Sequence, residues 1–340
     1  MKMKEAISKA SQNTDISPVY SWIVKKQRLN FIISGLQIFR ASFSALVLDH
    51  HQSFLPNDLS AIKLPLDKLQ RNLGVMVIPS FGSEIPIPRI SLRHNCICYI
   101  SENHDNHWIE MGASFEEYLM RLSKKSRHEL LRKVRKFEEK FGKNTSVKVY
   151  KKPEEMSSFL DLASRISRKT YQEILLNDGL PSTDEFSQEL VSLAAEDRVR
   201  GYLMMVDNAP VSYGYCVRQD SVLMYNITGY NPDYKEWSPG IVLFYSILDK
   251  VFAEERFRLL DLGSMKGQWK SSYVTCHNPG SRIIYIRCFS RYVPLVLAHW
   301  IVSSVSDFIV RLITVLGLNK KLRGLLHSRE ISTRRRAQGG

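Results

Sequence analysis

The feature that most constrains the fold is a set of three short apolar segments that lead directly into an apolar helix. Residues 201–206, 211–217 and 221–230 are rich in β-branched, aromatic and other apolar residues, and the sequences Asp-Asn-Ala-Pro and Arg-Gln-Asp separate them. Apolar runs divided by such turn residues are typical of an antiparallel meander. The chain then reads YKEWSPGIVLFYSIL over residues 234–248. We therefore expect three antiparallel strands followed at once by a largely buried helix.

The triplet Ser-Pro-Gly in this stretch predicts where the helix begins. Ser238 is a preferred N-cap, because its hydroxyl can accept a hydrogen bond from an early helical N–H, and Pro239 suits the first helical position. From Ile241 onward, apolar residues recur every three or four positions, as in a buried helix. Gly240 leaves the first turn unshielded, so its free N–H groups and the helix dipole favour an anion, and Lys235 adds a full positive charge. The alternative is an ordinary helix start without a ligand.

Helix and strand signals also flank the meander. Ser-x-x-Glu capping boxes at Ser114–Glu117 and at Ser126–Glu129 predict two helices, the second of which ends at Gly142. This second helix is very basic, and its charges form either a solvated face or a phosphate-binding face. The remaining expected elements are strand-like runs within residues 1–113, a strand at 146–152, helices around 154–176 and 184–196, and strands at 258–263 and 281–289.

Composition sets broader limits. A chain of 340 residues with 44% hydrophobic and 24% charged residues is typical of an ordered globular protein. The formal net charge of +14 favours a phosphate-bearing or polyanionic partner, or an anionic membrane surface. The five cysteines are odd in number, and the Cys96-Ile97-Cys98 spacing fits neither zinc knuckles nor redox motifs, which indicates a reduced, cytoplasmic compartment. The N-terminus has no apolar core of signal-peptide length. We interpret the sequence His-Asp-Asn-His at 104–107 as a polar loop, and we expect no metal site.

The order of these elements resembles the acyl-CoA pocket of the GNAT superfamily, whose loop pattern is Arg/Gln-x-x-Gly-x-Gly/Ala. Lys235, Ser238 and Gly240 fall on the three spaced positions. A closer resemblance is to the acetyltransferase-like group that is related to Fem-type aminoacyl transferases and is found around cellulose and exopolysaccharide biosynthesis. It covers residues 110–290 approximately, on three motifs: SFEEYLMRLSKKSRHELLRKVRKFEE, the SPG helix start, and DLGSMKGQWK. The last motif resembles D-[FL]-G-x-G-x-x-x-Y-K.

This final motif keeps the family's Asp261, Gly263 and Lys270 but departs from it at two positions. Met265 replaces the second glycine, and Trp269 replaces the tyrosine. If that tyrosine donates a proton in relatives, this chain must use another group, and Tyr273 is the nearest candidate.

The resemblance implies acyl transfer from acetyl-CoA or another acyl-CoA to an amine or hydroxyl. The cradle for the donor would comprise Lys235, Ser238, Pro239, Gly240 and Ile241, with a backbone N–H between Ile227 and Gly229 for the thioester carbonyl. Asp261 is the expected base or acceptor-orienting residue, although it could instead only cap the turn before Gly263. The other expected site residues are Tyr225 and Tyr230, which could relay a proton or simply pack, and Arg127, Arg168, Tyr171, Trp269 and Lys270 on the acceptor side, where the charged ones could equally be surface charges.

Two other functions remain open. A Fem-like aminoacyl transferase would use the basic helix at 126–140 to bind an aminoacyl-tRNA, although the long coiled-coil insertion common in that branch is missing. A non-catalytic membrane-surface protein would use the segment VPLVLAHWIVSSVSDFIVRLITVLGL at 293–318, which His299, Asp307 and Arg311 interrupt. Such a helix would lie on an anionic membrane or dock on the core, with a basic tail after it.

From these observations we expect an α+β, GNAT-like fold with a mixed, mostly antiparallel sheet flanked by helices. The expected domains are residues 1–113, which would be a degenerate GNAT-like half, residues 114–290, the acyltransferase domain, and residues 291–340, a helix and basic tail. The expected acceptor is a small metabolite, an amino acid, an amino sugar or a polysaccharide precursor.

Overall fold

The computed structural model describes residues 21–34, 36–49, 55, 59, 62–68, 74–82, 87–170, 179–263 and 268–315. The chain divides into two compact units. One comprises His104–Gly280, and the other comprises Met1–Asn103 together with Ser281–Gly340. The domain boundaries expected at 113/114 and 290/291 stay a prediction.

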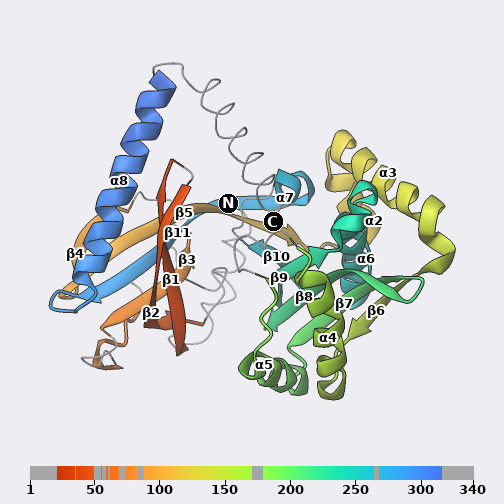
Figure 1. Ribbon diagram of the computed structural model, residues 1–340, viewed down its shortest axis with the longest axis horizontal. Helices are drawn as coiled ribbons and strands as arrows, with labels where there is room; N and C mark the ends of the chain where they lie inside the picture. The colour runs from red at the N-terminus through yellow and green to blue at the C-terminus, as the bar shows by residue number, and fades with distance from the viewer. Residues whose placement is uncertain are drawn as a thin grey trace, which may run out of the picture. The chain divides into compact units, whose positions relative to one another are not determined.

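The unit His104–Gly280 is built on one sheet with the strand order β5-β10-β9-β8-β7-β6 (Figure 1). Its strands are the second part of β5 (Cys96–Glu110), β6 (Thr145–Tyr150), β7 (Val199–Val206), β8 (Ala209–Gln219), β9 (Val222–Tyr230), β10 (Leu259–Gly263) and the start of β11 (Cys276–Arg287). Its helices are α2 (Phe115–Arg121), α3 (Lys124–Phe141), η4 (Gly142–Asn144), η5 (Pro153–Glu155), α4 (Met156–Ser167), α5 (Asp184–Ala195), η7 (Pro232–Trp237), α6 (Pro239–Ala253) and α7 (Gln268–Tyr273). The meander expected from the sequence is β7-β8-β9, and it leads into α6 as expected.

Helices cover both faces of this sheet. All eight residues of β7 are buried, as in a strand that is covered on both sides. Tyr202 and Met204 pack with α2, α3, α6 and α7 on one face, whereas Leu203 and Met205 pack with α4 and α5 on the other. α3 contributes a narrow apolar stripe that consists of Leu130, Val134 and Phe137, so its basic side chains remain at the surface.

Three local expectations are corrected. The second helix begins three residues early, because the Ser123 hydroxyl, not that of Ser126, caps it by accepting from the Ser126 N–H at 3.1 Å. Residues 104–107 lie within β5 and do not form a loop. The helix expected around 154–176 is the short η5 followed by α4, which ends at Ser167. The capping box at Ser114 is confirmed, because its hydroxyl accepts from the Glu117 N–H at 3.1 Å.

In the second unit, β1 (Trp22–Ile33) and β2 (Leu36–Leu48) form a long hairpin. The strand order is β1-β2-β3-β11-β5, and β4 pairs with β5. The other elements are η3 (Leu66–Lys68), β3 (Val75–Phe81), β4 (Ile90–Arg93) and α8 (Val293–Val315). Phe31, Phe43 and Val296 belong to the cluster beneath α8, so this helix docks on one face of the unit's sheet. The strand-like runs expected in residues 1–113 are confirmed where the structure describes them.

Candidate active site

The candidate site lies where the parallel strands β9 and β10 part. They pair only over Val222–Met224 and Leu259–Asp261. β9 then continues to Tyr230, and within the described residues no strand pairs with its β10-facing edge beyond Met224. Parallel strands that separate at their carboxyl ends next to a helix N-terminus form a crevice in which ligands commonly bind. The topology therefore leaves main-chain groups of β9 open to a ligand.

A β-bulge in β9 adds to this arrangement. Tyr215 pairs with Ile227, and Cys216 pairs with Tyr225, so Asn226 is an extra residue in the register between β8 and β9. A bulge bends its strand and re-aims the side chains and amides that follow. After it, Ile227 packs with the α4 and α5 cluster, whereas Tyr225 lies in the α6 cluster. The sequence analysis did not identify Asn226, because apolar alternation gives no sign of one inserted residue.

Gly229 in this segment is fixed by packing. A Cβ atom at Gly229 would lie 2.5 Å from Cε1 of Tyr213, closer than two carbons can approach. The Gly229 carbonyl accepts a hydrogen bond from the Ser212 hydroxyl at 3.0 Å. The segment Ile227–Gly229, expected to supply a backbone N–H to a thioester carbonyl, is therefore held in place from the β8 side.

The start of α6 differs from the expected cap. Ser238 is in the left-handed region, with φ 52° and ψ 47°, and its side chain makes no capping hydrogen bond, so the predicted hydroxyl cap is wrong. Its carbonyl instead accepts from the N–H groups of Ile241 at 3.0 Å and Val242 at 3.2 Å. Such a conformation costs a residue other than glycine on the order of 1 kcal/mol and is found preferentially where a backbone is shaped for function.

Because of these hydrogen bonds, fewer N–H groups of the expected phosphate cradle are available to a ligand than the sequence predicts. The Ser238 N–H donates to the Lys235 carbonyl, Pro239 has no N–H, and the Ile241 N–H is used by Ser238. Among residues 238–241, this leaves the N–H of Gly240, which is in the first turn, where an α-helix provides no internal acceptor. Its Cα is approached by Tyr230, whose Cδ1 would lie 3.4 Å from an added Cβ.

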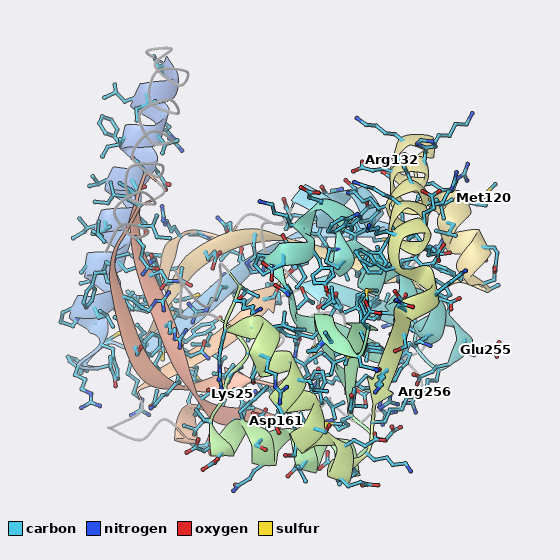
Figure 2. All side chains as sticks on the ribbon, turned by 45° about the vertical axis from the view of Figure 1, so that its right-hand side comes forward. Lys25, Met120, Arg132, Asp161, Glu255 and Arg256 are labelled. Carbon is cyan, nitrogen blue, oxygen red and sulfur yellow. The ribbon has the colours of Figure 1, made fainter. Side chains whose placement is uncertain are left out.

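Two lysines lie near this helix start. Lys235 is exposed in η7, immediately before Ser238. From α3, the Lys136 ammonium donates to the Glu236 carbonyl at 3.1 Å, which ties the basic helix to the same loop. Figure 2 shows Arg132 projecting outward from α3. Lys235 and Lys136 can therefore offset part of the charge of a phosphate, while Asp233 and Glu236 of η7 carry the opposite charge in the same loop.

Asp261 lies at the parting point itself, at the last residue of β10 that pairs with β9. It is buried, and its Oδ1 accepts the Gly263 N–H at 2.8 Å in a turn for which Gly263 takes φ +70°. The turn-capping role is thus present. A carboxylate can accept several hydrogen bonds, so the turn-capping bond is chemically compatible with a role in acceptor orientation or proton transfer.

The tyrosines separate into two groups. Tyr225 and Tyr273 are buried in the core beside Phe244, and burial raises the pKa of both hydroxyls, most strongly that of Tyr225. Lys133 partly offsets the effect of burial at Tyr273, but the pKa of this hydroxyl is still raised. Tyr230 differs, because 43% of its surface is exposed and its ring lies beside Gly240. Of the three, Tyr230 is therefore the one open to a ligand at the helix start.

Of the expected acceptor-side residues, the two whose side chains the structure describes, Arg127 and Arg168, are not brought together. Arg127 is on α3 and donates to the Met120 sulfur at 2.8 Å, on the α6 side of the sheet. Arg168 is exposed at the end of α4, on the other side. Trp269 and Lys270 fall in α7, where only the backbone is described, and Tyr171 lies outside the described residues.

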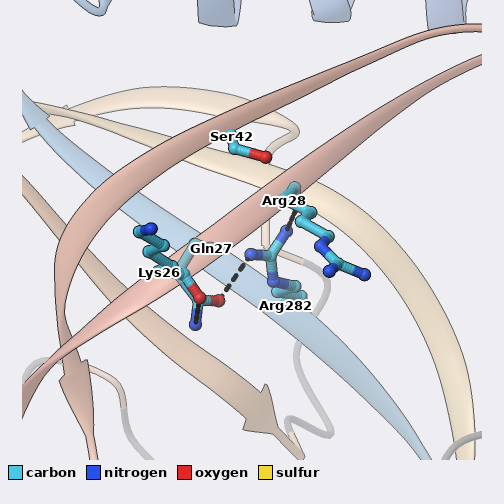
Figure 3. A pocket seen from close by; sticks show the side chains of 5 residues that line it. All are labelled: Lys26, Gln27, Arg28, Ser42 and Arg282. Atoms are coloured by element: carbon cyan, nitrogen blue, oxygen red, sulfur yellow. Dashed lines mark hydrogen bonds between the residues drawn. The ribbon is translucent and has the colours of Figure 1, made fainter. Parts of the chain in front are cut away.

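A concave surface in the other unit has a different chemistry. It has a volume of about 620 Å³ and is lined by Lys26, Gln27, Arg28, Ser42 and Arg282 (Figure 3). The Arg282 guanidinium donates to Gln27 Oε1 at 2.8 Å and to the Arg28 carbonyl at 3.2 Å. Its residues all belong to the unit that contains β1 and α8, so it is not part of the β9–β10 site. Among the residues that the structure describes, no group of three or more potential metal ligands is found.

Comparison with known proteins agrees with this fold. Residues 124–271 match a family model described as "Acetyltransferase (GNAT) domain". This stretch contains the parting strands, the SPG helix start and Asp261. The chain therefore carries a GNAT acetyltransferase domain, and by class it is an acyltransferase.

Solved structures with a similar course of the chain share little sequence with it. FemX is 12% identical, with 83% of this chain and 90% of that chain covered and a TM-score of 0.44. L-PGS from Bacillus licheniformis is 13% identical, with coverages of 76% and 82% and a TM-score of 0.46. A GCN5-related N-acetyltransferase from Kribbella flavida is 9% identical, with coverages of 86% and 96% and a TM-score of 0.38. No curated protein matches the sequence. At these sequence identities and TM-scores, the similar structures do not indicate a function for this chain.

Proposed function

We propose that the protein transfers an acyl group from acetyl-CoA or a longer acyl-CoA to an amine or hydroxyl. The observation that carries this proposal is the parting of β9 and β10 directly before a helix whose first turn contains Gly240 and is preceded by Lys235. The crevice is suited to an extended thioester, and the helix start is suited to its pyrophosphate.

In this proposal the Gly240 N–H and the α6 dipole bind the donor's pyrophosphate, and Lys235 neutralises part of its charge. Glycine at this position keeps the helix start open, since an added Cβ would be directed at the ring of Tyr230. The acyl arm lies along the β10-facing edge of β9. A main-chain N–H between Ile227 and Gly229 polarises the thioester carbonyl and stabilises the oxyanion as it forms.

The chemical step forms a C–N or C–O bond and breaks the C–S bond. The acceptor's lone pair attacks the thioester carbonyl, the tetrahedral oxyanion collapses, and the thiolate of CoA leaves. We assign Asp261 to orient the acceptor and to take its proton. We assign Tyr230 to protonate the thiolate, because Tyr225 and Tyr273 are buried and burial raises their pKa. Because Lys133 partly offsets the effect of burial on the pKa of Tyr273, that residue is second in order for this role.

The acceptor is proposed from the family resemblance. It would be a small metabolite, an amino acid, an amino sugar or a polysaccharide precursor in the cytoplasm, as the related proteins near exopolysaccharide loci suggest. Arg127 and Lys270 are the proposed contacts on the acceptor side.

A second candidate, aminoacyl transfer from a tRNA, is favoured by one observation. The exposed face of α3 is rich in lysine and arginine, and Lys136 contacts the η7 loop that precedes the donor site. A basic helix beside a phosphate site is suited to a nucleic-acid backbone. The two donors are distinguished by direct binding.

Isothermal titration with acetyl-CoA, longer acyl-CoAs and free CoA tests the proposal. Micromolar binding that is lost in the Gly240→Asp variant supports a CoA-dependent acyltransferase. If the intact chain binds none of these but does bind a charged tRNA, the donor assignment is wrong and the second candidate replaces it.

A further inference from the structure

Helix α8 is apolar on two opposite faces. One face docks on the sheet of its own unit, where Val296 and His299 are buried. The His299 ring contacts Phe31 with ring centroids 5.1 Å apart, and its Nδ1 lies 2.6 Å from the Tyr99 hydroxyl. This docked stripe accounts for the apolar residues that face the sheet, but it does not explain why the opposite face of the helix is also apolar.

The second apolar stripe faces away from the sheet. Its members are spaced by three or four positions, so they lie on one side of the helix, about 180° from His299 at 100° per residue. They are Leu297, Ile301, Val305, Phe308, Leu312 and Val315, and all are exposed. Exposure reaches 66% at Phe308 and 83% at Val315. Isolated exposed apolar residues are ordinary, but a contiguous stripe of this length marks an interaction surface.

The tip of the β1–β2 hairpin carries further exposed apolar residues. The Ser34 N–H, at the turn, donates to the Ser306 hydroxyl of α8 at 3.0 Å. At 100° per residue Ser306 is about 20° from His299, so the tip contacts the docked face near the middle of the helix. Exposed apolar residues gather on both strands of the tip: Ile32, Leu36, Ile38 and Phe39. We call the outer stripe of α8 the apolar lobe, and the exposed residues of the tip add apolar surface to the same unit.

The geometry excludes a simple membrane span. By length and composition, residues Val293–Ile313 are long and apolar enough to cross a bilayer. Only 11% of the most apolar stretch in this helix is buried. However, the inner face of the helix is docked on a sheet, and Arg89 forms a 2.7 Å ion pair with Asp307 in its second half. A helix held in this way can lie on a bilayer but cannot be surrounded by lipid.

Charge decides between a bilayer and a second copy of the chain. In this unit, basic residues with described side chains outnumber acidic ones: Lys25, Lys26, Arg28, Arg40, Lys63, Arg89, Arg93, Arg282, Arg287, Arg291 and Arg311 against Asp49, Asp67, Glu102 and Asp307. The sequence after the described part of α8 adds Lys320, Lys321, Arg323, Arg329, Arg334, Arg335 and Arg336 against Glu330 alone. Two such units repel each other, whereas an anionic bilayer attracts one.

We propose that the apolar lobe docks the protein on an anionic lipid bilayer, with the outer stripe of α8 at the level of the acyl chains and the surrounding cations at the headgroups. This inference goes beyond the proposed acyl transfer, because every residue of the lobe lies in the unit that does not contain the β9–β10 site. Docking would confine the enzyme to the membrane surface, where its acceptor would then be encountered.

The test is co-sedimentation of the full chain with phosphatidylcholine vesicles, with and without phosphatidylglycerol. The double variant Val305→Ser, Phe308→Ser changes only exposed side chains, and we expect it to bind anionic vesicles at least roughly tenfold more weakly. Val191→Ser on α5 is the matched control, since Val191 and Val305 are similarly exposed, at 38% and 45%, and the control should bind as the unchanged chain does.

The proposal is supported if the unchanged chain binds anionic vesicles, binds neutral vesicles much less, and loses binding in the double variant. It is overturned if the chain binds neither vesicle, binds both equally, or binds unchanged in the double variant. It is also overturned if sedimentation velocity shows a dimer that only the double variant dissociates, because the lobe would then be an interface between copies. Unaltered thermal unfolding and acyl-CoA titration of the variant establish that fold and donor site are intact.

Discussion

Replacing Gly240 with aspartate places one negative charge where the pyrophosphate is proposed to bind. An aspartate in the first turn of a helix is favourable in itself, by about 0.3–1 kcal/mol, so α6 should fold normally. The added Cβ would lie 3.4 Å from Tyr230 Cδ1, an ordinary contact. The variant therefore changes the charge of the site without an expected loss of stability.

The effect on binding follows from Coulomb's law. Two unit charges about 4 Å apart repel by roughly 4 kcal/mol at the effective dielectric of a protein surface, which corresponds to nearly a thousandfold weaker binding. Salt reduces this repulsion, so part of the loss should be recovered as ionic strength rises.

The assay is isothermal titration of acetyl-CoA into three chains: the unchanged protein, Gly240→Asp, and Gly240→Asn. Asparagine has the volume of aspartate without its charge, so it should weaken binding much less. Equal loss in both variants would indicate bulk and not charge. Unchanged binding by a folded Gly240→Asp chain would refute the proposed cradle.

Three further predictions concern other residues. Asp261→Asn keeps an oxygen to accept the Gly263 N–H but loses the base, so thermal stability should hold while CoA release with an accepted amine falls about 10²–10⁴-fold; Asp261→Ala should lose stability as well. An unchanged turnover in Asp261→Asn would show that Asp261 is not the base and only stabilises the turn. Gly229→Ala should cost about 1–3 kcal/mol of unfolding free energy in urea titrations, because its Cβ would overlap the Tyr213 ring, and a variant as stable as the unchanged chain would contradict this packing. Burial lowers the pKa of His299 below its ordinary 6.5, so the unfolded chain binds the proton more readily, and the unfolding free energy should fall as pH drops below about 6.5. His299→Gln should lose this component when melts at pH 7.5 and about pH 5.5 are compared.

Turn residues and helix start signals allowed the order of the secondary-structure elements to be predicted from the sequence. The meander was predictable because turn residues separate three apolar runs, and α6 because Ser-Pro-Gly precedes a periodic apolar stretch. The interior of this region is covered on both faces, so its apolar pattern is nearly continuous and hard to mistake for a surface loop.

Where tertiary pairing overrides local preference, the prediction failed. The residues His104 to His107 have poor strand propensity and resemble a loop, yet His107 pairs with Gly263 and Trp108 pairs with Asp261. Context of this kind routinely outweighs the intrinsic preference of a short polar segment. The same pairing aligns Asp261 at the parting of the strands, which the sequence could only suggest through resemblance.

The backbone features that shape the candidate site are the ones that a sequence hides most completely. Alternation of side chains predicts which residues share a face only while pairing is continuous, and one inserted residue reverses it. In β9 that residue is Asn226, so Tyr225 and Ile227, which alternation would place on the same face, lie on opposite faces of the sheet. The left-handed conformation of Ser238 could not be predicted from the sequence either. A serine before a helix suggests a side-chain cap, whereas here its carbonyl accepts hydrogen bonds from the first helical N–H groups. Both features set the course of the main chain at the candidate site, and main-chain conformation of this kind is not encoded in side-chain patterns.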